Sequence, residues 1–155
     1  MKLYMVQHAE PTSKLEDPAR PLSSKGRRTI RKIARYARRH LQIQVDQVVH
    51  SGKLRAQQTA EILATHLLPA NGVKADMNLE PLADPRILKE RLAEATKSIM
   101  LVGHLPHLSK LASLLLVGNE DKEVLAFRMA GIACLECDQQ RHWSIQWVIT
   151  PESTP

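Results

Sequence analysis

The stretch Leu3-Tyr4-Met5-Val6-Gln7-His8-Ala9-Glu10-Pro11 decides the fold class, because an apolar segment runs directly into a histidine. The segment from Lys2 to Gln7 is short and apolar, which predicts a strand. Prolines with Ser, Thr and Asp between them follow as far as Leu22, which predicts a loop. Strand ends beside helix N-termini are where α/β proteins bind ligands. We therefore expect a ligand site at His8.

Two further segments have a similar form. A predicted strand over Val45–His50 breaks at Ser51-Gly52 into a helix from about Lys53 to Leu67, for which Ser51 is the expected cap. An apolar strand over Ser98–Gly103 ends at His104. An arginine in the first turn of a helix, here Arg55, suits a phosphate, as do two histidines at strand ends. We expect His8, Arg55 and His104 to converge on one anion.

Strand and helix patterns alternate along the rest of the chain. They predict helices from Ser23 or Ser24 to His40, from Arg86 to Ala95 and over His107–Val117. They also predict a connecting segment over Pro69–Asn78 and a hairpin of Ile132–Cys137 with Trp143–Ile149. This alternation favours an α/β fold with helices on both sides of a mostly parallel sheet. The hairpin makes the sheet mixed. We expect one domain over residues 1–151 and a C-terminal tail over residues 152–155.

Taken together, these segments resemble the histidine phosphatase superfamily, which includes phosphoglycerate mutase, and especially its small SixA-type phosphohistidine phosphatases. The resemblance lies in the start Leu-Tyr-Met-Val-Gln-His-Ala, the loop Arg20-Pro21-Leu22-Ser23 with Gly26, the helix start Leu54-Arg55-Ala56-Gln57-Gln58-Thr59-Ala60, and Val102-Gly103-His104-Leu105-Pro106. It implies a three-layer α/β/α sandwich of the phosphoglycerate mutase type. It also implies that His8 is a nucleophile and that Arg55 and His104 bind the phosphoryl oxygens.

The residue before His8 departs from the family pattern, because the family's arginine is Gln7 here. An amide keeps two donors and can still contact a phosphoryl oxygen, but it brings no charge. By analogy with the loss of one donor at a charged transition state, the cost is about 3 kcal/mol. Asp84 and Glu80 lie where superfamily members place a general acid, and they are our candidates for that role.

Three functions remain open on the sequence. The first is a phosphatase that acts on phosphohistidine through a phosphorylated His8, with a phosphorylated protein as its partner. The second is a weakly active or non-catalytic phosphate- or phosphoprotein-binding module, which Gln7 would explain. The third is a phosphatase for small phosphate esters.

Composition and charge limit the partners. The formal charge of +6 suggests anionic partners, and the excess is concentrated in the basic helix over residues 25–40. This helix is either a solvated face or a docking surface for an acidic protein or, as the weakest alternative, for nucleic acid. An aromatic content of 3% argues against base-stacking platforms for single-stranded nucleic acid, so a nucleic-acid partner is not expected. We expect no membrane segment, a cytoplasmic location, no cofactor and no metal site. Cys134 and Cys137 fall on a predicted strand, where residues three apart point to opposite faces, so we expect free thiols.

Overall fold

Six strands form one mixed sheet in the order β3-β2-β4-β1-β5-β6 in the computed structural model, which describes residues 1–155. Strands β3, β2, β4 and β1 are parallel to one another, and β5 is antiparallel to both of its neighbours, β1 and β6. The strands are β1 (Lys2–Gln7), β2 (Gln47–His50), β3 (Val73–Ala75), β4 (Ile99–Gly103), β5 (Ile132–Cys137) and β6 (Trp143–Ile149). The predicted mixed, mostly parallel sheet is confirmed.

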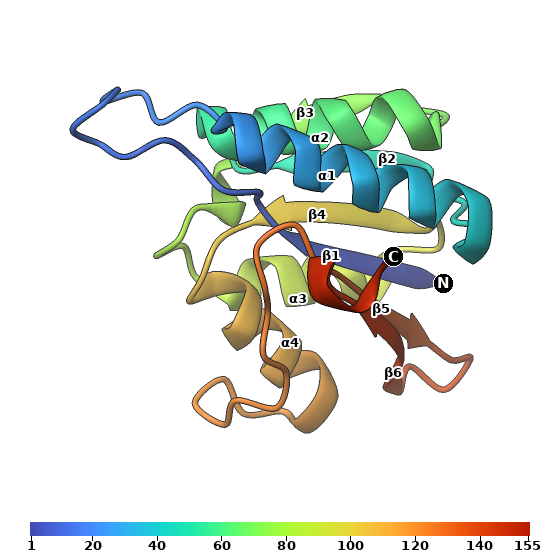
Figure 1. Cartoon of the computed structure of the whole chain (residues 1–155). Coiled ribbons are helices and arrows are strands. Elements are labelled where there is room, and N and C mark those ends of the chain that lie inside the picture. The colour runs from blue at the N-terminus through green and yellow to red at the C-terminus, as the bar shows by residue number, and fades with distance from the viewer.

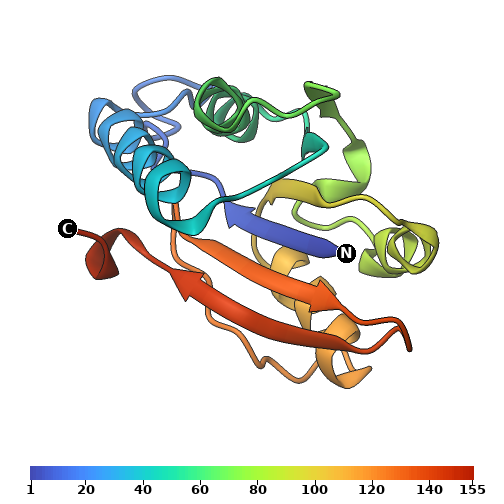
Figure 2. The same ribbon diagram turned by 90° about the vertical axis from the view of Figure 1, so that its right-hand side faces the viewer.

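Two helices cover each face of this sheet, which gives the three layers seen in Figures 1 and 2. The helices α1 (Ser24–Tyr36) and α2 (Leu54–Leu67) pack on one face, and α3 (Pro85–Glu94) and α4 (His107–Val117) pack on the other. Ser23 caps α1 by accepting a hydrogen bond from the backbone of Gly26 at 2.9 Å. The predicted α/β/α sandwich is therefore confirmed.

The two faces of the sheet enclose two separate aliphatic cores. Side chains alternate along β1, so Tyr4 and Val6 lie in the core beneath α1 and α2, while Leu3 and Met5 lie in the core beneath α3 and α4. Both cores are built almost entirely from Leu, Ile, Val, Ala and Met, as the scarcity of aromatic residues predicts. This packing fixes the position of the strand that delivers His8.

Some elements differ from the sequence predictions. Val73–Ala75, placed in a connecting segment, forms edge strand β3; all three residues are exposed, so no buried pattern marks them. The basic helix ends as α-helix at Tyr36 and continues as a π-helical turn over Ala37–Leu41. Residues of the predicted tail form a short 3₁₀ turn over Pro151–Ser153, and Lys32 on α1 donates hydrogen bonds to this segment.

The strand order brings the candidate residues together. Strands β2, β4 and β1 are neighbours and parallel, so their carboxyl ends lie at one edge of the sheet. His50, His104 and His8 lie at or directly after these three ends. The backbone N–H of His8 donates to the carbonyl of Gly103 at 3.1 Å, which ties the β1 end to the β4 end. None of the helices is both long and apolar enough to cross a membrane.

Candidate active site

His8 lies at the carboxyl end of β1 with its ring held in one orientation. The side chain is 9% exposed, and Nδ1 lies 2.7 Å from the carbonyl oxygen of Ala9. Because a carbonyl only accepts, Nδ1 must carry the proton and donate it, which leaves Nε2 without a proton in the neutral ring. Burial lowers the pKa of His8 to about 4; the Ala9 carbonyl opposes this, and the charges of Arg55 and Arg20 reinforce it. The ring is therefore neutral at physiological pH.

Two guanidinium groups act on His8 from different elements. Arg55 is in the first turn of α2, as predicted, and its Nε is buried without a hydrogen-bond partner. Burial lowers the pKa of Arg55, and the nearby charge of Arg20 lowers it further. Arg20 comes from the loop after β1, where its Nε donates to the carbonyl of Thr12 at 3.3 Å. Two close cations at a strand end form a site suited to an anion.

His104 lies beside His8, with their ring centroids 4.9 Å apart. Its Nε2 is 2.6 Å from the hydroxyl of Ser51, and its Nδ1 is buried without a partner. Ser51 also accepts a hydrogen bond from the backbone of Lys53 at 3.3 Å, so its own proton is free to be donated to His104. In that arrangement the ring proton of His104 is on Nδ1. Burial lowers the pKa of His104 to about 3, helped by the ring of His8 and the charge of Arg55.

The first turns of α2 hold these residues in register. The hydroxyl of Thr59 accepts a hydrogen bond from the backbone of Ala9 at 3.0 Å and donates one to the carbonyl of Arg55 at 2.7 Å. The amide oxygen of Gln58 accepts from the backbone of Leu22 at 2.8 Å. Thr59 therefore links the loop that follows His8 to the helix that carries Arg55, and Gln58 fixes the loop that carries Arg20.

Gln7 is the last residue of β1 and is half-buried. Its backbone pairs with Gly103 on one side, and its carbonyl accepts a hydrogen bond from Ala130 at 3.0 Å on the other. Its side-chain amide makes no hydrogen bond to the protein. The amide is therefore free for a ligand but adds no charge to the site.

The carboxylates near the site are engaged elsewhere or stand alone. Asp84 caps α3 and accepts hydrogen bonds from the backbone and Nε of Arg86, each at 3.0 Å, and its pKa is lowered chiefly by the Arg86 side chain. Glu10 pairs with Lys25 at 3.6 Å and accepts from Ser23. Glu80 is half-buried and forms no ion pair. Of the two predicted candidates for a general acid, Asp84 is thus held as a helix cap.

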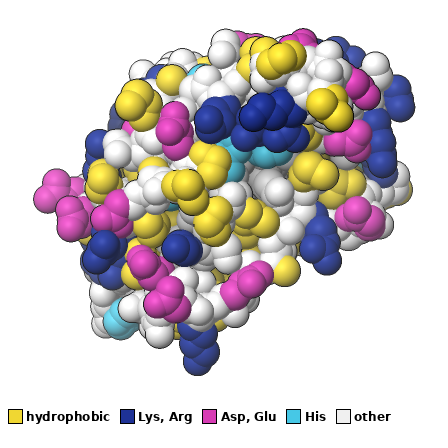
Figure 3. Space-filling view, turned by 90° about the vertical axis from the view of Figure 1, so that its left-hand side faces the viewer, with side chains coloured by type: hydrophobic (Ala, Val, Ile, Leu, Met, Phe, Trp, Pro, Cys, Tyr) yellow, Lys and Arg dark blue, Asp and Glu magenta, His cyan; other side chains and the backbone are white.

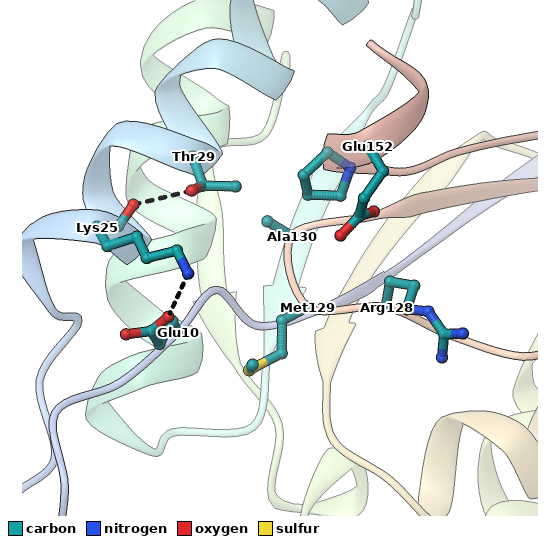
Figure 4. Close-up of a pocket in the computed structure, with 8 residues that line it drawn as sticks. Glu10, Lys25, Thr29, Arg128, Met129, Ala130 and Glu152 are labelled. Carbon is teal, nitrogen blue, oxygen red and sulfur yellow. Dashed lines mark hydrogen bonds and ion pairs between the residues drawn. The ribbon is translucent and has the colours of Figure 1, made fainter.

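Glu10 lines a separate hollow of about 200 Å³ beside the loop that follows His8, shown in Figure 4. In that view the carboxylate of Glu10 is directed towards Lys25 on α1, and Glu152 approaches from the C-terminal turn. The hollow is lined by Glu10, Lys25, Thr29, Arg128, Met129, Ala130, Pro151 and Glu152. It contains none of the predicted catalytic residues.

The histidines are reached through a hollow in the face that Figure 3 presents, at the carboxyl ends of the parallel strands. Lys and Arg side chains gather along one side of this hollow, and hydrophobic side chains lie along the other. Among the exposed apolar residues are Leu82 and Leu105, in loops at this end of the sheet.

No group of three or more His, Cys, Asp or Glu side chains is placed to hold a metal ion. Cys134 and Cys137 are both buried and free, as predicted. Burial raises the pKa of Cys134 to about 11, so this thiol is protonated and unreactive at neutral pH.

Sequence reasoning placed Ser51 as a helix cap, but the N-cap of α2 is Lys53, and Ser51 contacts His104 instead. Reasoning from sequence also gave no role to Arg20 or Thr59. Both belong to the stretches that carried the family resemblance, Arg20-Pro21-Leu22-Ser23 and Leu54–Ala60. That resemblance was the only available signal, because neither residue lies on a periodic pattern that points to the site.

Comparisons with known proteins agree with this geometry. The family model of the histidine phosphatase superfamily (branch 1) matches residues 3–79. The structure of the protein histidine phosphatase SixA complexed with tungstate superposes with a TM-score of 0.85 at 23% identity, covering 97% of both chains. A comparison with curated proteins gives no match.

Two further solved structures share the fold at lower identity. A phosphoserine phosphatase variant from Entamoeba histolytica in complex with phosphoserine has a TM-score of 0.70 at 14% identity, covering 98% of both chains. A mycobacterial glucosyl-3-phosphoglycerate phosphatase complexed with VO3 also has a TM-score of 0.70, at 16% identity over 94% of this chain and 97% of that chain. With the family match and this shared fold, the chain belongs to the histidine phosphatase superfamily.

Proposed function

We propose that the chain is a phosphatase that hydrolyses phosphohistidine on a protein, through a phosphoryl group carried covalently by Nε2 of His8. The orientation of His8 is the observation that carries this proposal. Its Nδ1 is bound to the Ala9 carbonyl, which leaves Nε2 unprotonated beside His104 and under the influence of two guanidinium groups. A neutral, oriented ring nitrogen next to cationic groups is a suitable nucleophile for phosphoryl transfer.

The reaction has two displacement steps. In the first, His8 Nε2 forms a bond to phosphorus while the P–N bond of the substrate breaks, and the substrate imidazole leaves with the bonding electron pair. In the second, the oxygen of a water molecule forms a bond to phosphorus, and the P–N bond to His8 breaks with its electron pair returning to Nε2. Inorganic phosphate leaves with the two protons of that water. Arg55 and Arg20 supply charge to the phosphoryl oxygens, and Nδ1–H of His104 supplies a hydrogen bond.

The carboxylates support phosphohistidine over a phosphate ester. An alcohol leaving group needs a proton from an acid close to the site. Asp84 is fixed by Arg86 with a lowered pKa, so it is ionised at neutral pH and is a poor proton donor. An imidazole leaving group is neutral when its other ring nitrogen already carries a proton, so its departure requires no enzymic acid. Glu80 remains the candidate acid for the alternative ester activity.

Gln7 supports a second candidate, a phosphoprotein-binding module with little catalysis. The half-buried amide of Gln7 makes no hydrogen bond to the protein, so it offers donors to a bound phosphoryl group without a charge that strengthens in the transition state. Both candidates use the same cluster of His8, Arg55, Arg20 and His104. They differ only in whether phosphate is transferred to His8.

The test is to trap the phosphorylated protein. The chain is mixed with a phosphohistidine peptide, quenched at alkaline pH within milliseconds to seconds, and analysed by mass spectrometry. We expect phosphate on His8 and its absence in the His8→Asn variant, whose amide has similar size but no reactive ring nitrogen. Retained peptide binding without any phosphate on His8 would favour the binding module. Phosphate on a different residue would contradict both assignments.

A further inference from the structure

The solvent face of α1 carries a row of cations that we call the arginine stripe: Arg28, Arg31, Arg35 and Arg39. All four are exposed, and the first three lie on α1 while Arg39 lies in the turn that continues it. The opposite face of α1 buries Gly26, Ile30, Ile33 and Ala34 against the core. Spacings of three and four residues place the stripe on one side of the helix, over a length of about 16 Å at 1.5 Å per residue.

The arginine stripe has no partner within the chain. Between Ser24 and Leu41 there is no acidic residue, and the single ion pair from this segment joins Lys25 to Glu10. Arg38 and Lys32 donate to backbone carbonyls, but the four stripe arginines form no ion pair or hydrogen bond with the protein. Like charges four residues apart, such as Arg31 with Arg35, destabilise a helix. The segment keeps this repulsion without any internal compensation.

The positive potential of the stripe reaches neighbouring groups. Burial lowers the pKa of His66 on α2, and Arg35, Arg38 and Arg31 lower it further. At the far end of the stripe lies a hollow of about 340 Å³ lined by Lys32, Arg35, Tyr36, Arg39, His40 and Pro155. The rings of Tyr36 and His40 line it with their centroids 4.7 Å apart and their planes tilted by 39°. A long row of cations that ends in a cation-lined hollow matches an extended anionic surface.

The helix that carries the stripe begins beside the loop that follows His8. The backbone of Ser23 donates to the carbonyl of Glu10 at 2.9 Å, and Glu10 lies two residues after His8. The first turn of α1 lies so close to Glu10 that a Cβ on Gly26 would be 2.1 Å from the Glu10 oxygen. Arg28 follows Gly26 by two residues. An interface of standard size, about 800 Å² on each partner, is large enough to reach from the catalytic hollow onto the stripe.

We propose that the arginine stripe docks the acidic face of the phosphorylated protein whose phosphohistidine enters the active-site hollow. This inference rests on the proposed function. An acidic helix repeats its carboxylates at the same three- and four-residue spacing as the stripe, so the two surfaces are complementary in charge and period. Single-stranded nucleic acid is the weaker fit, because the chain has few aromatic side chains on which bases could stack.

The experiment compares three substrates. Two are helical peptides that each carry one phosphohistidine; one peptide has an acidic face, and the other has Gln at each acidic position. The third is phosphoimidazole, a small substrate that cannot reach the stripe. The test variant is Arg28→Gln/Arg35→Gln/Arg39→Gln. The control variant, Lys74→Gln/Lys89→Gln/Lys122→Gln, removes the same charge from exposed lysines that form no ion pair. We expect the parent to have a kcat/KM about tenfold higher for the acidic peptide than for its Gln counterpart at low salt. The test variant should lose this preference and the control variant should keep it, while phosphoimidazole hydrolysis is unchanged in both.

Several results would overturn the docking proposal. One is an equal loss of the preference for the acidic peptide in the test and control variants. A second is the absence of this preference in the parent protein. A third is tighter binding of a DNA duplex than of the acidic peptide through the same arginines. If the parent hydrolyses neither the peptides nor phosphoimidazole, the proposed function fails. Docking is then decided by fluorescence anisotropy of the unphosphorylated peptides. Tighter binding of the acidic peptide to the parent than to the test variant would support the stripe, and equal binding would refute it.

Discussion

The hydroxyl of Ser51 lies 2.6 Å from Nε2 of His104, at the point where the ends of β2 and β4 meet. Lys53 donates its backbone N–H to the same hydroxyl, so the serine proton is directed at the histidine ring. The ring then keeps its own proton on Nδ1, which is buried and has no protein partner. A residue expected to cap a helix therefore sets the tautomer of the second site histidine, and with it the donor offered to a phosphoryl oxygen.

The first prediction follows from this contact. Ser51→Ala should lower kcat by about ten- to a hundredfold, because His104 loses the partner that fixes its tautomer. Ser51→Thr keeps the hydroxyl and should retain most of the activity. Ser113→Ala is the matched control, since Ser113 is a buried serine on α4 whose hydroxyl has no partner. Equal activity in Ser51→Ala and Ser113→Ala would show that the contact is only structural.

Substitution of either site arginine should weaken the binding of a phosphate analogue. Arg55→Lys keeps the positive charge but removes the planar fork, and we expect at least a tenfold weaker affinity for vanadate. Arg20→Ala should weaken vanadate binding as well, because Arg20 contributes charge at His8 and Arg55. Isothermal titration with vanadate measures both. Unchanged affinity in Arg20→Ala would remove that residue from the site, and Lys122→Ala controls for the change in net charge.

Gln7→Arg tests whether the pocket is a weakened catalyst. A guanidinium at this position should raise kcat by about tenfold on both a phosphohistidine peptide and an aryl phosphate, because it adds a charged donor to the transition state. Gln7→Met, which removes the amide at similar length, should lower kcat. Steady-state hydrolysis of both substrates by the three proteins is the assay. A folded Gln7→Arg protein that binds vanadate without any gain in rate would favour the binding module.

The protonation of His8 should be visible directly. Its pKa is lowered to about 4, chiefly by burial, so the ring should stay neutral from pH 8 down to about pH 5. Ring ¹⁵N chemical shifts report this titration, with free histidine as the reference. Nδ1 should have the shift of a protonated nitrogen and Nε2 that of an unprotonated one across this range. A midpoint near the ordinary value of about 6.5 would mean that the ring is not neutral where the mechanism requires it.

His107 should make the fold sensitive to acid. It is 1% exposed, and neither ring nitrogen has a partner. Burial lowers its pKa to about 4, although Asp84 acts in the opposite direction. In the unfolded chain the pKa of His107 returns to about 6.5, so the unfolded state binds more protons than the folded state between pH 4 and pH 6.5. Its contribution to stability is therefore present above pH 6.5 and is lost as the pH falls towards 4.

His107→Leu removes this titrating group and two unpaired nitrogens. The free energy of unfolding is measured with urea at pH 7 and at pH 4.5 for both proteins. We expect the decrease between pH 7 and pH 4.5 to be about 1–2 kcal/mol smaller in the variant than in the parent. Stability at pH 7 should be equal or higher, because a buried polar ring without partners is replaced by an apolar side chain. An identical loss in both proteins would mean that His107 does not titrate in this range.

The sequence by itself determined the elements with strong local signals. The apolar run that ends at His8, the helix over His107–Val117 and the hairpin strands around residues 138–142 were predicted with their observed or nearly observed bounds. Apolar runs bounded by turn residues mark these elements, and such runs are a property of the local sequence. The edge strand β3 was missed because its three residues are exposed and form no apolar run.

What only the tertiary structure decided is which groups meet at the end of the sheet. The sequence shows that Ser51, Arg55 and His104 lie near strand ends, but the partner of Ser51 depends on β2 and β4 being neighbours. The approach of Arg20 to His8 depends on the path of an irregular loop, which Gln58 on α2 holds in place. Contacts between residues far apart in the chain are set by strand order and loop path. No local pattern encodes these, because each side chain finds its partner only once the sheet has assembled.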